Sequence, residues 1–229
     1  SWRCSLRASY WWAMDQRHMI LYVGDIPLRL NDAVNDRVNE QINDFVAAMS
    51  GRDQSAGYYT DRRRAPASKV ADDIAVGKKA EFFALLALYR HYGFPSVPVD
   101  LEIRRGKQKG WATDLPFAEA DRRFPNAHVK ACSDKTIAFC GDFSWTFQIG
   151  DTRGANGIDD IFMRGNDDIL VLVYLADAVT PEAVVKAIIP WDTAQLYLKD
   201  PRKASLVGLK KCLYYADLQD AFAKLQATA

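Results

Sequence analysis

The feature that most constrains the fold is the run DILVLVYLAD at residues 168–177. It is the most apolar stretch of the chain, and it has the length of a strand. Such a run is typical of a strand that is covered on both faces. We therefore expect a central β-strand here, and with it a sheet that needs helices or a second layer on each side.

A second strand is predicted by FPNAHVKACS, residues 124–133, because its side chains alternate in character with period 2. One set is small and apolar, and the other carries polar or reactive groups: Asn126, His128, Lys130 and Cys132. SWTFQ at 144–148 also alternates. VDLEIRR and WATDLPF, separated by the turn-like GKQKG, predict a β-hairpin before them.

Helical spacing of apolar residues predicts helices over 31–49, over 78–93, where Gly93 ends the helix, and in the tail from about 216. Residues 182–189 fit a helix or a strand equally well. The fold class expected from these elements is α/β, with a mixed central sheet flanked by helices. We predict a single domain over 1–229, in which an N-terminal helical region (about 1–75) packs on a core (about 76–229).

Composition excludes several classes of protein. Hydrophobic residues make up 49% of the 229 residues and charged residues 26%, which is ordinary for a globular protein. The net charge of +1 neither requires nor excludes a nucleic-acid partner. The four cysteines show no C-x-x-C spacing, which favours a reducing, cytoplasmic setting over a zinc site. No apolar run has the length of a membrane span, so we expect no membrane partner.

Three polar residues stand where a purely structural role is costly or unexplained. Glu81 lies in a helix with apolar residues on nearly every side, and a lone buried carboxylate is unfavourable unless it is paired or bound to metal. Asp114 lies in the predicted hairpin and Lys130 in the strand that follows. Asp100, on the first hairpin strand, is the main alternative to Asp114. Carboxylate oxygens suit Mg²⁺ or Mn²⁺, and such metals can activate water for phosphodiester hydrolysis.

The order of these residues resembles that of the PD-(D/E)XK nuclease superfamily, type II restriction endonucleases in particular, over about residues 76–176. The resemblance implies a DNA endonuclease with Asp114 as the hairpin acid, Glu81 as the helix acid and Lys130 as the catalytic lysine. Asp114, Glu81 and the carbonyl of Val129 would hold Mg²⁺ or Mn²⁺. The family usually has an acid two residues before the lysine. This chain has His128 at that position, and three roles stay open for it: a metal ligand, a general base or a structural group.

The resemblance also implies double-stranded DNA as substrate and, for two-fold symmetric sites, a homodimer. The hairpin tip is expected to contact phosphates. Side chains of SWTFQ, Trp145 among them, are expected to line the substrate groove. The loop GDTRGANG is expected to contact bases. The candidate DNA-binding residues are Arg104, Arg105, Lys107, Lys109, Gln148, Arg153 and Asn156. Two alternatives stay open, a structure-specific repair or recombination nuclease and a non-catalytic DNA-binding protein of the same fold.

Overall fold

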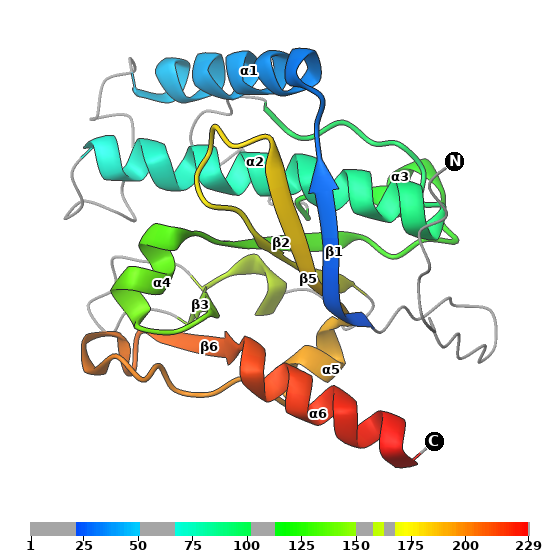
Figure 1. The fold of residues 1–229 in the computed structure, drawn as a ribbon, viewed down its shortest axis with the longest axis vertical. Helices are drawn as coiled ribbons and strands as arrows, with labels where there is room; N and C mark the ends of the chain where they lie inside the picture. Colours follow the sequence, from blue (N-terminus) through cyan, green and yellow to red (C-terminus); the bar gives the residue numbers. More distant parts are fainter. Residues whose placement is uncertain (1–21, 51–66, 102–112, 150–157, 163–167, 229) are drawn as a thin grey trace.

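Sheet A is the centre of the molecule, and it is mixed (Figure 1). Its strands lie in the order β1 (Tyr22–Arg29), β5 (Glu182–Pro190), β4 (Ile169–Tyr174) and β2 (Ala127–Cys132). β2 pairs with β4 in parallel, whereas the β4–β5 and β5–β1 pairs are antiparallel. The computed structural model describes the following parts of the chain: 22–50, 67–101, 113–149, 158–162 and 168–228.

The predicted central strand is confirmed as β4. It lies between β5 and β2, and five consecutive side chains, Ile169 to Val173, are buried. The α/β fold with a mixed sheet and flanking helices is confirmed as well. The segment 182–189, whose apolar residues fitted a helix or a strand, belongs to the strand β5.

α2 (Ala67–Tyr92) packs on one face of sheet A, and α1 (Asp32–Ser50) lies alongside α2 (Figure 1). Side chains of α2 such as Phe83 and Leu88 are fully buried in the core between the helices and the sheet. α2 begins well before the helix expected from residue 78, so residue 75 lies inside it. The N-terminal part of the chain also contributes a strand, β1, to the sheet.

A second layer covers the other face of sheet A. It contains β3 (Ser144–Gln148) and β6 (Lys210–Tyr214), which form an antiparallel pair. The core under this layer includes Trp145, Phe147 and Trp191. The remaining described elements are α3 (Phe117–Ala120), α4 (Asp134–Cys140), η4 (Asp160–Phe162), α5 (Trp191–Gln195), η5 (Ala204–Leu206) and α6 (Tyr215–Thr228).

The predicted hairpin is only partly described, because residues 102–112 lie outside the described ranges. The flanking residues differ from the prediction. Residues 99–101 form no strand, and Leu115 makes only an isolated antiparallel bridge to Ala127. Phe117, expected in the second hairpin strand, begins helix α3.

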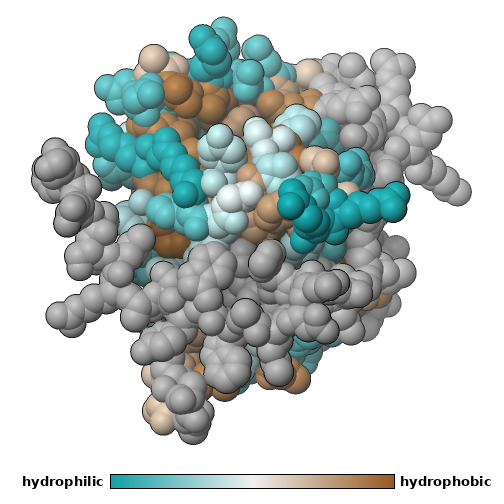
Figure 2. All heavy atoms as spheres, turned by 90° about the vertical axis from the view of Figure 1, so that its right-hand side faces the viewer, coloured by the Kyte–Doolittle hydropathy of each residue, from teal (hydrophilic) through white to brown (hydrophobic). Residues whose placement is uncertain are grey.

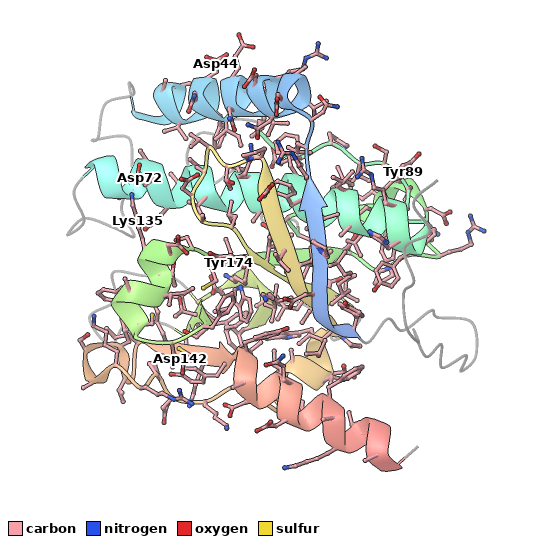
Figure 3. All side chains as sticks on the ribbon, in the orientation of Figure 1. Asp44, Asp72, Tyr89, Lys135, Asp142 and Tyr174 are labelled. Carbon is pink, nitrogen blue, oxygen red and sulfur yellow. The ribbon has the colours of Figure 1, made fainter. Side chains whose placement is uncertain are left out.

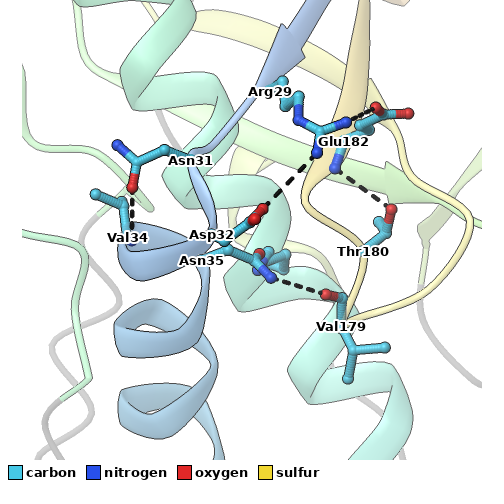
Figure 4. A network of polar contacts seen from close by, with 9 residues as sticks. Arg29, Asn31, Asp32, Val34, Asn35, Val179, Thr180 and Glu182 are labelled. Atoms are coloured by element: carbon cyan, nitrogen blue, oxygen red, sulfur yellow. Dashed lines mark hydrogen bonds and ion pairs between the residues drawn. The ribbon is translucent and has the colours of Figure 1, made fainter.

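The start of α1 is tied to the sheet by a polar network (Figure 4). The side chain of Asn31 accepts a hydrogen bond from the backbone N–H of Val34 at 2.9 Å, which satisfies a donor of the first helical turn. Arg29 contacts Glu182 at 2.7 Å, and Asn35 donates to the carbonyl of Val179 at 3.2 Å. The Arg29 contact joins the end of β1 to β5, and the Asn35 contact joins α1 to the loop before β5.

α1 is held to α2 by a buried lysine. The Nζ of Lys79 donates to the side-chain oxygens of Asn35 and Asn39, each at 2.5 Å. Burial lowers the pKa of Lys79 to about 8, although the charges of Asp177 and Asp36 oppose the shift. A buried ammonium needs such partners, so this contact fixes α1 on α2.

α4 connects the two layers at one end of the molecule. Its N-cap Ser133 accepts a hydrogen bond from the N–H of Thr136, and Tyr174 donates to Asp134 at 2.7 Å. Lys135 lies beside Asp72 of α2 (Figure 3), with Nζ and Oδ2 2.7 Å apart.

Hydrophilic side chains cover much of the face drawn in Figure 2, with apolar groups between them. Exposed large apolar side chains of the described residues include Tyr89, Phe139 and Leu196. Among the described helices, none is long and apolar enough to cross a membrane.

Candidate functional site

The first part of the candidate site is the outer edge of β2. As far as the described residues go, β2 is the last strand of sheet A, and Thr113 to Leu115 run along its outer side. Leu115 and Ala127 exchange two backbone hydrogen bonds at 3.0 Å, and the hydroxyl of Thr113 donates to the Ala127 carbonyl at 2.7 Å. These contacts place Asp114 against the strand.

Asp114 completes this edge with its side chain. Its Oδ2 accepts a hydrogen bond from the backbone N–H of Val129 at 2.7 Å. The N–H and C=O of one residue in a strand point toward the same edge. The carbonyl of Val129, predicted as a metal ligand, therefore faces the edge along which Asp114 lies.

The second part of the site is Glu81, which α2 places over the same strand. Glu81 is only 6% exposed, and both of its carboxylate oxygens are 2.9 Å from the Nζ of Lys78. Burial raises the pKa of Glu81 to about 8, and the nearby charges of Asp114 and Asp100 act in the same direction, while Lys78 opposes them. Glu81 is therefore a buried acid on which the charges of two acids from other segments act.

This arrangement predicts a pH-dependent stability in the absence of metal. Between the ordinary pKa of a glutamate, 4.5, and about 8, the folded state holds a proton on Glu81 that the unfolded state has lost. The contribution of Glu81 to the free energy of unfolding therefore falls as the pH rises through this window, and stays constant above it. Glu81→Gln removes this dependence.

Urea unfolding of the wild type and of Glu81→Gln at pH 5.5, 7 and 9, in chelator, measures the effect. As the pH rises, we expect the free energy of unfolding of Glu81→Gln to increase relative to that of the wild type. Glu119→Gln, which changes an exposed acid of α3, serves as the control. Parallel stability curves for wild type and Glu81→Gln contradict the prediction.

Lys130 lies on the other face of β2. Ala127, Val129 and Ala131 belong to the α1–α2 core, so the alternating side chains point toward the β3–β6 layer. The Nζ of Lys130 is 2.8 Å from Oδ2 of Asp159, and it lies 5.3 Å from the ring centre of Phe147. The structure therefore does not bring the ammonium of Lys130 together with Glu81 and Asp114.

His128 shares the face of Lys130, as predicted, but it is buried. Its Nε2 is 2.9 Å from Oδ2 of Asp168, the residue that precedes β4. This contact joins the starts of the two parallel strands β2 and β4. The structure thus shows His128 in a structural pair, and it lies on the face away from the carboxyl groups.

Some partners of the site were missed from the sequence. Lys78 stands three residues before Glu81, and this spacing places two side chains side by side on a helix, so the pair was detectable. Asp159 has no such local signal. It binds both Lys130 and the backbone N–H of Gln148, each at 2.8 Å, and its position depends on tertiary structure.

The donor atoms suit a divalent cation only in part. Within the described ranges, no three His, Cys, Asp or Glu side chains stand close enough to hold a metal as they are. Both oxygens of Glu81 contact Lys78, and Oδ2 of Asp114 contacts Val129. The donors are carboxylate and carbonyl oxygens, which Mg²⁺ and Mn²⁺ accept, and Mg²⁺ commonly needs only one or two carboxylates besides water.

Most of the candidate DNA-binding residues lie outside the described ranges: Arg104, Arg105, Lys107, Lys109, Arg153 and Asn156. Gln148 is described, and it lies half-buried at the end of β3. Trp145 was expected to line a substrate groove, and this prediction is wrong. Its side chain is fully buried, and its indole N–H donates to the carbonyl of Val173 at 3.2 Å.

Compared with protein-family models, with curated proteins and with solved structures, the chain gave no match.

Proposed function

We propose that the protein is a metal-dependent endonuclease that hydrolyses phosphodiester bonds of double-stranded DNA. The observation that carries the proposal is the buried carboxyl group of Glu81 on α2, whose pKa is raised to about 8 by burial and by the negative charges of Asp114 and Asp100. Carboxylates whose charges act on one another in this way repel, and a divalent cation would offset that repulsion. Perturbed acids of this kind are typical of functional sites.

Glu81, Asp114 and the carbonyl of Val129 are the proposed ligands of Mg²⁺ or Mn²⁺, with Asp100 as a further acid. The metal supplies a lowered pKa for bound water and charge neutralisation on the phosphate. Asp114 has a second task, because its contact with Val129 fixes the strand edge that carries the ligand carbonyl. Glu81 contributes from a helix that is packed rigidly on the sheet.

The finer parts of the proposal rest on the sequence resemblance. They are a sequence-specific type II restriction activity, a homodimer that cuts both strands, and a cytoplasmic location. Phosphate contacts are assigned to Arg104, Arg105, Lys107 and Lys109, and groove contacts to Gln148, Arg153 and Asn156.

A specific observation favours the second candidate function, a non-catalytic DNA-binding protein. Both basic side chains of β2 are held by acids, Lys130 by Asp159 and His128 by Asp168. Side chains that already contact acids are less available to a scissile phosphate.

The test is incubation of plasmid and phage DNA with the protein in Mg²⁺, in Mn²⁺ and in chelator. Discrete fragments that require metal support the proposed restriction endonuclease. Nicking that depends on DNA structure points to a repair nuclease instead. Binding without cleavage in either metal overturns the nuclease proposal and favours the binding protein.

Lys130 was expected to contact the scissile phosphate, but its ammonium lies on the face of β2 away from Glu81 and Asp114, where it contacts Asp159. We therefore expect Lys130→Ala to retain metal-dependent cleavage, because the proposed metal ligands lie on the other side of the strand. Asp159→Asn should retain cleavage as well. Initial rates on a plasmid measure both variants, and loss of cleavage in a folded Lys130→Ala shows that the ammonium takes part in the reaction.

A further inference from the structure

Basic residues gather in the segment that leads from α5 through β6. From Leu196 to Tyr214 the chain has five basic residues and a single acid, Asp200, whereas the whole chain has 30 basic and 29 acidic residues. The five, which we call the β6 cations, are Lys199, Arg202, Lys203, Lys210 and Lys211. This segment lies at the opposite end of the molecule from α1 (Figure 1). The charge of the chain is thus balanced overall and positive in this region.

Three of the β6 cations contact acids, and these contacts lie at the surface. The pairs are Lys199 with Asp217, Lys211 with Asp200 and Arg202 with Asp142. The side chains of the three cations are between 36% and 59% exposed. An exposed ion pair contributes only about 0–1 kcal/mol, because water already solvates both charges. A phosphate group can therefore replace such an acid, or share the cation with it.

Aromatic rings hold two of the β6 cations in place. The Nζ of Lys203 donates to the carbonyl of Phe139 at 2.9 Å and lies 3.2 Å from the ring centre of the same residue. The guanidinium of Arg202 lies 4.3 Å from the ring centre of Tyr214. An aromatic face attracts a cation without neutralising its charge. These two charges are positioned before a partner arrives, which lowers the entropy cost of binding.

Lys210 lies beside a residue that is already proposed to contact DNA. In the antiparallel pair of β3 and β6 it stands directly opposite Gln148. Side chains that are directly opposite in such a pair point to the same face. The β6 cations therefore adjoin the proposed groove contact of Gln148.

We infer that the β6 cations form a surface that binds the phosphate backbone of double-stranded DNA. The inference rests on the proposed function for the identity of the partner, and it adds the surface that holds the duplex. A row of phosphates suits several cations spread over a surface, because each contact releases counter-ions from the duplex. Such contacts orient the duplex and do not read its sequence.

The test is DNA binding by the full-length protein in chelator, measured as the fluorescence anisotropy of a labelled duplex at several salt concentrations. Arg202→Gln, Lys203→Gln and Lys210→Gln should each weaken binding several-fold at low salt. Each should also reduce the slope of log affinity against log salt concentration by about one, because one phosphate contact is lost. Arg37→Gln removes an exposed cation from α1 and should change neither quantity.

Far-ultraviolet circular dichroism checks that each variant is folded. Wild-type affinity and salt slope in all three folded variants overturn the inference and leave the proposed endonuclease in place. An equal loss in Arg37→Gln also overturns it, because net charge would then decide the binding. A wild type that binds vesicles of anionic lipid but no DNA in chelator overturns it as well, and the plasmid cleavage assay decides separately on the endonuclease.

Discussion

Asp114→Asn is expected to abolish metal-dependent DNA cleavage while leaving the protein folded. The asparagine side-chain oxygen can still accept the hydrogen bond that Val129 donates at 2.7 Å. What the variant loses is the negative charge that a divalent cation needs. Loss of a group in a metal site commonly reduces affinity or activity by a factor of about 100, and we expect at least that much for a direct ligand. Initial cleavage rates at several Mg²⁺ concentrations measure it.

Two further variants decide whether Asp114 is the right acid. Asp121→Asn removes a charge that pairs with Arg123 two residues away, and its activity should match the wild type. Asp100→Asn tests the alternative acid near Glu81. An active Asp114→Asn together with an inactive Asp100→Asn shows that Asp100 holds the metal.

Trp145→Ala is expected to cause the largest loss of stability of any single substitution discussed. Trp145 is fully buried in the core between sheet A and the β3–β6 layer, and its ring contacts those of Phe143 and Tyr215. Truncation of a buried tryptophan typically costs about 3–5 kcal/mol, through lost apolar burial and the cavity that remains. It also leaves the carbonyl of Val173 without its indole donor. Urea unfolding followed by circular dichroism measures the change.

Trp145→Phe refines the prediction, because phenylalanine keeps one buried aromatic ring and loses the five-membered ring with its N–H. We expect a clearly smaller loss of stability than for Trp145→Ala. The folded molecules of both variants should bind DNA with the affinity of the wild type. Unchanged stability with weakened DNA binding in both variants would place Trp145 at the surface, against the structure.

The strands that were predictable are those with one clear period. β2 and β3 alternate, and β4 is apolar throughout, so each was placed correctly. β5 was ambiguous because its second half, from Ala187 to Pro190, is buried on both faces, which hides the period of 2. β1 was missed because Gly24, Asp25 and Pro27 interrupt it, residues that an edge strand tolerates.

The candidate site was predictable to a similar degree. Glu81 stood out as a carboxylate among apolar residues, and the structure shows it buried and close to Asp114. The face of Lys130 was also predicted correctly. The side of the sheet on which that face lies, relative to α2, depends on how the layers stack. Its acid partner Asp159 is 29 residues away along the chain, so no local pattern could show the pair.

The contact between Asp114 and Val129 also has a consequence for the behaviour of the protein in solution. An end strand with free N–H and C=O groups invites pairing with another chain and thereby aggregation. Thr113 and Leu115 occupy the outward N–H and C=O of Ala127, and Asp114 occupies the N–H of Val129. A residue proposed for metal binding thus also shields part of this sheet edge from self-association. Asp114→Ala would uncover one amide of the strand, which makes Asp114→Asn the cleaner variant for any measurement of activity.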